Sequence, residues 1–189
     1  TACIQAGLSL DTIARCLMDP SWRIGECIRD KGSQAKRHLQ RTLDRAKEVG
    51  PQLNAYATLT PDLALKQAKQ AEAEINAGKY RGPLHGIPYA AKDLLAVPGY
   101  PTTWGARPLV NQTFDITATV IRKLADAGAV LLGKAAMIEL AGGMGYRFAS
   151  ASATGPAKNP WNTGCWTCGS SSVGADPAGW EANDLRGSP

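Results

Sequence analysis

The sequence predicts an α/β fold with a mixed sheet flanked by helices. Segments with helical spacing of apolar residues alternate with short segments of strand-forming residues, which is typical of α/β folds. The run "AVLLGK" at residues 129–134 is typical of a strand buried on both faces. A hydrophobic content of 44% and a charged content of 20% support a globular core. The length of 189 residues suits one medium domain or a piece of a larger one, and no linker divides it.

Residues 1–80 are expected to be mainly helical. Residues 8–18 have the pattern of a short helix. Residues 32–50 predict a surface helix that ends at Gly50. Its buried stripe is expected to consist of apolar residues at three- and four-residue steps, namely Ala35, Leu39, Leu43 and Ala46.

A strand and a second helix follow. Residues 53–60 are rich in strand formers. The next helix is predicted to begin with Thr60 as its cap and Pro61 at its first position, and to end at Gly78.

Residues 81–172 are expected to form the core of the domain. The glycines and prolines of "GPLHGIPYAAKDLLAVPGYPTTWGA" predict a strand followed by a loop. Residues 116–127 predict a helix stopped by Gly128. A long glycine-, serine- and proline-rich loop follows the buried strand, and residues 173–189 form an atypical tail.

The net charge of +5 comes largely from basic residues between Lys31 and Lys47. This cluster fits either a nucleic-acid surface or the solvated face of a helix, and the second interpretation is favoured. Aromatic residues make up 6% of the chain, which argues against a stacking platform for single-stranded nucleic acid. A nucleic-acid partner is therefore not expected.

Membrane association is not expected either, because no apolar run reaches the length of a membrane span. Five cysteines without regular spacing favour reduced thiols in the cytoplasm over a disulfide framework. The chain begins with Thr1, so a preceding export signal stays open. The oligomeric state stays open too, a homo-oligomer included.

Lys92 in "GIPYAAKDLL" is one candidate site residue. A surface lysine at a strand end is the simpler interpretation of the pattern. Alternatively, burial would lower the pKa of the amine, so that the neutral form could accept a proton.

The run "CGSSSVG" places Ser170, Ser171 and Ser172 behind a glycine. It fits a flexible polar loop, or a serine that relays a proton to a lysine, as in sites where lysine replaces histidine.

Two further motifs are weak. Residues 128–135 have the spacing of a phosphate-binding loop, but Val130 and Leu131 occupy the cradle and Ala135 replaces the Ser or Thr that binds magnesium. The pair Cys165 and Cys168 has no second CxxC and no paired histidines, so neither a metal site nor a redox pair is favoured.

Three stretches between about Leu53 and Ser172 resemble the amidase signature family. They are "GKYRGPLHGIPYAAKDLLAVPGYPTTWGA", "DITATVIRKLADAGAVLLGKAAMIELAGG" and "NPWNTGCWTCGSSSVG". The resemblance implies the mixed β-sheet core of that family, flanked by helices and incomplete.

The resemblance also implies hydrolysis of carboxylic amides by a serine–serine–lysine triad. By position, Lys92 matches the lysine base and Ser170 the bridging serine. Neutral Lys92 would take a proton through Ser170 from a third serine, which attacks the amide carbonyl and forms an acyl-enzyme. A small-molecule amide is the implied partner, and no metal or organic cofactor is required. Met144 in "GGMGY" is expected to line the substrate pocket.

The third serine has no good match in this chain. In the family it follows the bridging serine by roughly two dozen residues. Ser188 comes several residues too early, and from Val173 onward the tail departs from the small-residue helix of the family. Pro177 would break such a helix. A truncated or frame-shifted coding sequence is the explanation this pattern suggests, with impaired hydrolysis by residues 1–189 alone.

Two alternatives to a free-standing amidase stay open. One is the glutaminase-bearing A subunit of an amidotransferase that amidates mischarged tRNA. The other is a non-catalytic remnant. The sequence does not reveal which amide would be cleaved.

Overall fold

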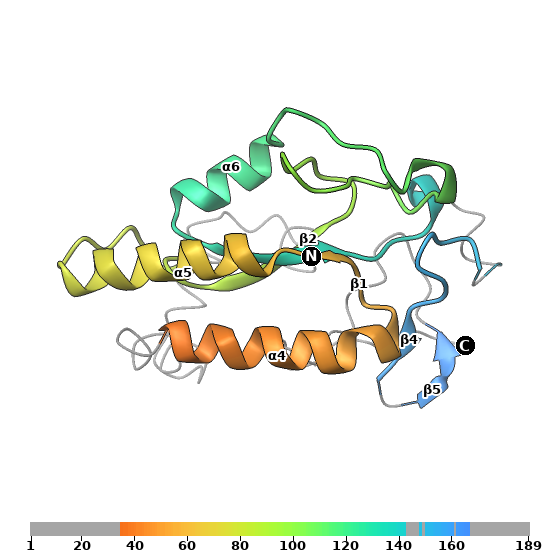
Figure 1. Cartoon of the computed structure of the whole chain (residues 1–189), viewed down its shortest axis with the longest axis horizontal. Helices are drawn as coiled ribbons and strands as arrows, with labels where there is room; N and C mark the ends of the chain where they lie inside the picture. Colours follow the sequence, from red (N-terminus) through yellow and green to blue (C-terminus); the bar gives the residue numbers. More distant parts are fainter. Residues whose placement is uncertain (1–34, 143–147, 149, 161, 167–189) are drawn as a thin grey trace, which may run out of the picture.

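A three-stranded mixed sheet forms the centre of the protein (Figure 1). The computed structural model describes residues 35–142, 148, 150–160 and 162–166. The strand order is β1 (Tyr56–Leu59), β3 (Val130–Ala135), β2 (Pro88–Lys92), with β3 antiparallel to β1 and parallel to β2. The predicted α/β fold with a mixed sheet is therefore confirmed. All six residues of β3 are buried, as predicted from its unbroken apolar run.

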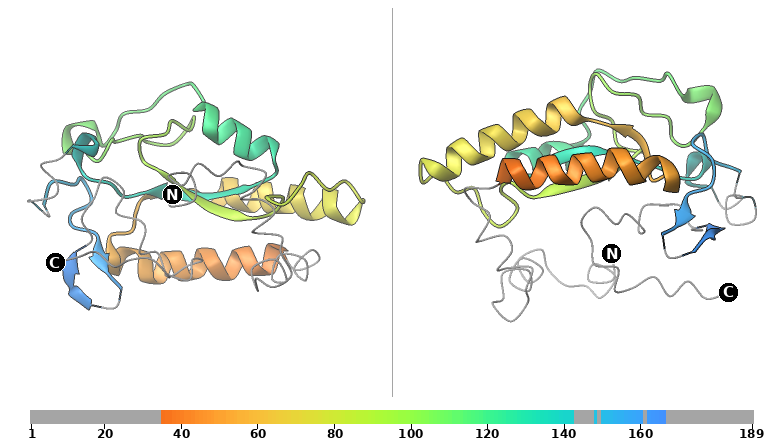
Figure 2. Two further views of the ribbon diagram at one scale, coloured as in Figure 1. Left: turned by 180° about the vertical axis from the view of Figure 1, so that it is seen from behind. Right: turned by 60° about the horizontal axis from the view of Figure 1, so that its bottom comes forward.

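Helices cover both faces of this sheet. Helices α4 (Ala35–Leu53) and α5 (Pro61–Asn76) lie side by side on one face, and α6 (Thr119–Asp126) lies on the other (Figures 1 and 2). Short 3-10 helices occupy Arg107–Leu109 (η2) and Glu139–Ala141 (η3). A separate antiparallel hairpin consists of β4 (Lys158–Asn159) and β5 (Asn162–Trp166), where the sequence had predicted only loop.

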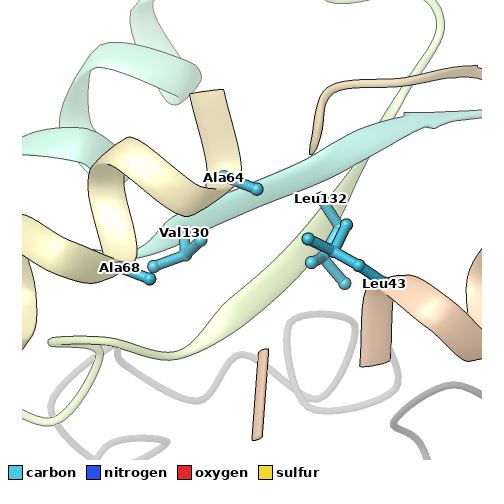
Figure 3. Close-up of a cluster of buried hydrophobic side chains, with 5 residues drawn as sticks. All are labelled: Leu43, Ala64, Ala68, Val130 and Leu132. Carbon is cyan, nitrogen blue, oxygen red and sulfur yellow. The ribbon is translucent and has the colours of Figure 1, made fainter. Parts of the chain in front are cut away.

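The two faces of β3 carry separate hydrophobic clusters. On the side of α4 and α5, five buried residues pack together: Leu43, Ala64, Ala68, Val130 and Leu132 (Figure 3). On the side of α6, Leu131 packs with Ala91, Val97 and Ile121. Small alanines on α5 let that helix approach the sheet closely.

A β-bulge interrupts the pairing of β2 with β3. Tyr89 pairs with Leu131 and Ala90 pairs with Gly133, so Leu132 has no partner on β2. A bulge shifts the alternation of side chains by one position. Residue 134 therefore lies on the face of Leu131, toward α6.

The end of α4 differs from the prediction. The helix continues past Gly50 through Pro51 to Leu53, whose side chain is buried. Gly50 instead gives Tyr56 room, because a Cβ at this position would lie 3.3 Å from the Tyr56 ring. The chain leaves the helix at Asn54, which has a φ of 52°.

Helix α5 begins where the sequence predicted and ends at Asn76, two residues before the predicted Gly78. Thr60 precedes its first residue, and Gly78 follows its end with a φ of 74°. However, the Thr60 hydroxyl does not cap the helix, because it donates to the Leu131 carbonyl at 2.9 Å. Helix α6 begins at Thr119, three residues later than predicted.

The predicted helix at residues 8–18 and the atypical tail lie outside the described residues. Within the described ranges, no helix has both the length and the apolar character that a bilayer crossing requires.

Candidate active site

Lys92 is the last residue of β2, and its position in the sheet is defined by pairing with Ala135 of β3. Since β2 and β3 are parallel, their carboxyl ends lie at the same edge of the sheet. Ligand sites of open α/β sheets lie outside this edge. The loop after β2 and the loop after β3 both begin here. Lys92 is thus placed where a ligand site would form.

The Lys92 side chain is half-buried. Burial lowers the pKa of its amine below the usual value of 10.5, because the charged form loses water contacts. A lower pKa increases the neutral fraction near neutral pH, which is the property that a lysine base needs.

Backbone strain concentrates in the loops at this edge. Trp104, Leu140 and Ala141 have positive φ angles near 51°, a region that non-glycine residues rarely adopt. The two loops are hydrogen-bonded, because the Leu140 amide donates to the Trp104 carbonyl at 2.8 Å. A third segment joins them, since the Ala153 amide donates to the Gly105 carbonyl at 2.7 Å. Strain of this kind clusters at functional sites, which supports the placement at this edge.

Beside Lys92 lies a buried polar cluster that sequence reasoning missed. Asp93 and Lys134 are both fully buried, and Lys134 Nζ lies 2.9 Å from Asp93 Oδ1. The other carboxylate oxygen of Asp93 accepts from the Thr103 amide at 3.0 Å and from the Thr103 hydroxyl. Lys134 also donates to the Pro101 carbonyl at 2.8 Å and to Thr102 Oγ1 at 2.5 Å. The available signal was a lysine inside a strand predicted to be buried on both faces.

A half-open hollow of about 100 Å³ lies at the opposite end of the strands, beside His85 and Gly128. Arg81 forms an ion pair with Glu74, with Nη2 2.5 Å from the carboxylate, and His85 Nε2 lies 3.2 Å from the same carboxylate. The Arg81 guanidinium holds the pKa of Glu74 at about 2. This hollow is remote from Lys92, and we assign it no substrate.

The two other predicted site residues, Ser170 and Met144, lie outside the described residues. Cys165 is exposed and unpaired on β5, whereas Cys168 lies outside the described part. Within the described ranges, no three His, Cys, Asp or Glu side chains gather as metal ligands.

The protein thus has an α/β fold, and the carboxyl edge of its sheet carries a lysine suited to acid–base chemistry. The family model described as Amidase matches residues 37–175, and the chain belongs to that family. The match ends two residues after Val173, where the sequence predicted a departure from the family pattern.

The chain is similar to curated amidotransferase subunits and to solved amidases. The A subunit of the glutamyl-tRNA(Gln) amidotransferase from Hahella chejuensis is 43% identical over 136 residues, which are 72% of this chain and 27% of the relative. The mitochondrial A subunit from Ixodes scapularis is 48% identical over 109 residues, which are 58% and 21% of the two chains. A solved peptide amidase from Stenotrophomonas maltophilia is 35% identical with a TM-score of 0.66, covering 74% of this chain and 29% of that one. The chain thus spans about a quarter of the length of these relatives.

The relatives correct the expectation about partners. The sequence predicted a small-molecule amide as the partner and no nucleic acid. This prediction was wrong, because the curated relatives are subunits of an amidotransferase named for glutamyl-tRNA. Charge and aromatic content report only on direct nucleic-acid binding by this chain. They carry no information on partners that an assembly brings together.

Proposed function

We propose that the protein hydrolyses the C–N bond of a carboxylic amide and that Lys92 is its general base. The observation that carries this proposal is the half-buried Lys92, with a lowered pKa, at the carboxyl edge of a sheet in a chain of the amidase family. Its neutral amine is the group that can accept a proton near neutral pH.

The proposed chemistry follows the resemblance described above. Ser170 bridges the base to a nucleophilic serine, whose position in this chain is not assigned. The nucleophile loses its proton toward Lys92 and bonds to the amide carbon. The amine leaves with a proton, and water then cleaves the acyl-enzyme to release the acid. We propose a cytoplasmic location, supported by cysteines without framework spacing.

The identities favour an A-subunit role in an amidotransferase over a free-standing amidase. The curated relatives named above reach 43% and 48% identity, whereas the peptide amidase reaches 35%. In this role the substrate is glutamine, and the ammonia serves amidation of a mischarged glutamyl-tRNA bound with partner subunits.

Lysine variants test the role of the base. In the complete gene product that contains these residues, Lys92→Ala is expected to reduce hydrolysis of a small aryl amide and of glutamine by about 100- to 10,000-fold. Lys92→Arg is expected to be equally impaired, because a guanidinium stays protonated. Lys66→Ala, on the exposed side of α5, is the matched control and should keep full activity. Full activity of Lys92→Arg, or no hydrolysis by the unmodified protein, would overturn the proposal.

Partner dependence tests the A-subunit role. Glutamine hydrolysis is measured with and without the other amidotransferase subunits and glutamyl-tRNA(Gln). Stimulation by these additions supports the role. Hydrolysis of aryl amides by the protein alone, without any response to the additions, identifies a free-standing amidase instead.

A further inference from the structure

The charged pair next to Lys92 is unusual for its complete burial. Within the described residues, Asp93 and Lys134 are the members of the Asp, Glu, Lys and Arg set that are buried. Burying an ion pair costs several kcal/mol of desolvation for each ion, and hydrophobic replacements often match its stability. Stability alone is therefore a weak reason for this pair.

The surroundings of Lys134 favour its cationic form. Its Nζ donates to the Pro101 carbonyl and to Thr102 Oγ1, and it lies 2.9 Å from Asp93 Oδ1 as an ion pair. A carboxylate this close favours the charged ammonium. Burial lowers the pKa of Lys134, and the Asp93 carboxylate opposes that shift.

The pair joins the elements that define the position of Lys92. Asp93 directly follows Lys92, and its amide donates to the Ala135 carbonyl at 3.1 Å, which continues the pairing of β2 with β3. Its carbonyl accepts from the Trp104 amide at 3.3 Å. The hydrogen bonds of the pair to Thr103 and Pro101 also hold the loop after β2, which contains the strained Trp104, against the sheet.

We propose that Lys134 is a positioning residue for Lys92, because it neutralises the carboxylate that directly follows the base and fixes the loop beside it. This inference rests on the proposed role of Lys92. Strand alternation places the Lys92 side chain on the sheet face opposite the side chains of Asp93 and Lys134, so their charges act on its amine through space.

Charge balance makes this role measurable. An uncompensated carboxylate one residue away would favour the protonated form of Lys92, and an uncompensated Lys134 cation would disfavour it. Opposite charges on the order of 10 Å apart in protein shift a pKa by about one unit. Helix α6 packs on the sheet face that carries Asp93 and Lys134. Its own charged side chains are exposed, namely Arg122, Lys123 and Asp126.

The test measures the proton affinity of Lys92 without requiring hydrolysis. In the complete gene product, the rate of Lys92 acetylation by acetic anhydride is followed by peptide mass spectrometry from about pH 6 to about pH 11. Lys134→Met is expected to raise the labelling pKa by about one unit, and Asp93→Asn is expected to lower it. The double variant Asp93→Asn/Lys134→Met should return within about 0.3 units of the unmodified protein. Circular dichroism verifies folding in each case.

A purely structural pair gives a different pattern. Loosening of the loop would expose Lys92 in all three variants and raise its labelling pKa toward about 10.4. That result, or equal shifts in both single variants, overturns the proposal. If a single variant does not fold, the double variant tests the proposal by itself, because it leaves no buried charge unpaired. The proposal requires that the labelling pKa of Lys92 be unchanged in the double variant. An inactive protein with the predicted labelling shifts refutes amide hydrolysis but not the charge balance.

Discussion

The contact between the two strained loops predicts a large cost for Gly105→Ala. Gly105 has a φ of +70°, and a Cβ there would lie 2.6 Å from the Met137 carbonyl oxygen and 2.8 Å from that of Ile138. The left-handed conformation costs a non-glycine residue about 1–2 kcal/mol. Both obstructing atoms belong to backbone and cannot rotate away, which adds about 1–3 kcal/mol of overpacking. The free energy of unfolding should fall by about 2–5 kcal/mol.

Gly99→Ala is the matched control for this prediction. Gly99 has a φ of +80°, but nothing lies within 4 Å of the position that a Cβ would occupy there. Its substitution should therefore cost only the conformational term of about 1–2 kcal/mol. Urea unfolding of both variants, followed by far-ultraviolet circular dichroism, gives the difference. Equal losses for the two variants would show that the loops do not approach each other as described.

Three other predictions concern stability. Leu43→Ala should lower the free energy of unfolding by about 3 kcal/mol, because Leu43 is fully buried between α4 and β3, whereas exposed Arg45→Ala should change it by less than about 0.5 kcal/mol in the same urea titration. Thr60→Val should lower the free energy of unfolding by about 1 kcal/mol, because the hydrogen bond to the Leu131 carbonyl is lost. Thr60→Ser keeps the hydroxyl and should lower it less. The reverse order of the two variants would contradict the hydrogen bond. Burial lowers the pKa of His85, so the unfolded chain binds the proton more tightly than the folded protein does. The free energy of unfolding should therefore fall as the pH drops below about 6.5. The urea midpoints at about pH 7.5 and about pH 5.5 should differ less in His85→Gln than in the unmodified protein.

Local sequence signals predicted most elements of the described fold. Pro61 after Thr60 defines the start of α5 because proline at the first helical position loses no hydrogen bond. Glycines at 78 and 128 end helices because they adopt positive φ without strain. The same reasoning failed at Gly50, where packing of Leu53 and the approach of Tyr56 outweighed the local signal. The β4–β5 hairpin was missed because its strands are short and largely exposed, so they carry no alternating pattern.

The candidate site divides in the same way. Lys92 was identified from its motif, and the structure adds its half-buried position and the direction of its pKa shift. Neither Asp93 nor Lys134 was identified as a site residue from the sequence. Their pairing depends on a bulge and on a loop that returns to the sheet, and neither is encoded within a short window.

The sequence by itself determined the kinds of elements, their order and the residue types available for chemistry, because helix caps, turns and apolar periodicity act over a few neighbouring residues. Only the tertiary structure decided which of those residues are deprived of water and which charges meet. Thr60 bonds to a carbonyl 71 residues away, and Lys134 bonds to a threonine 32 residues away. Such contacts arise when strands pair and loops close over them, and burial then determines the proton affinity of each ionisable group.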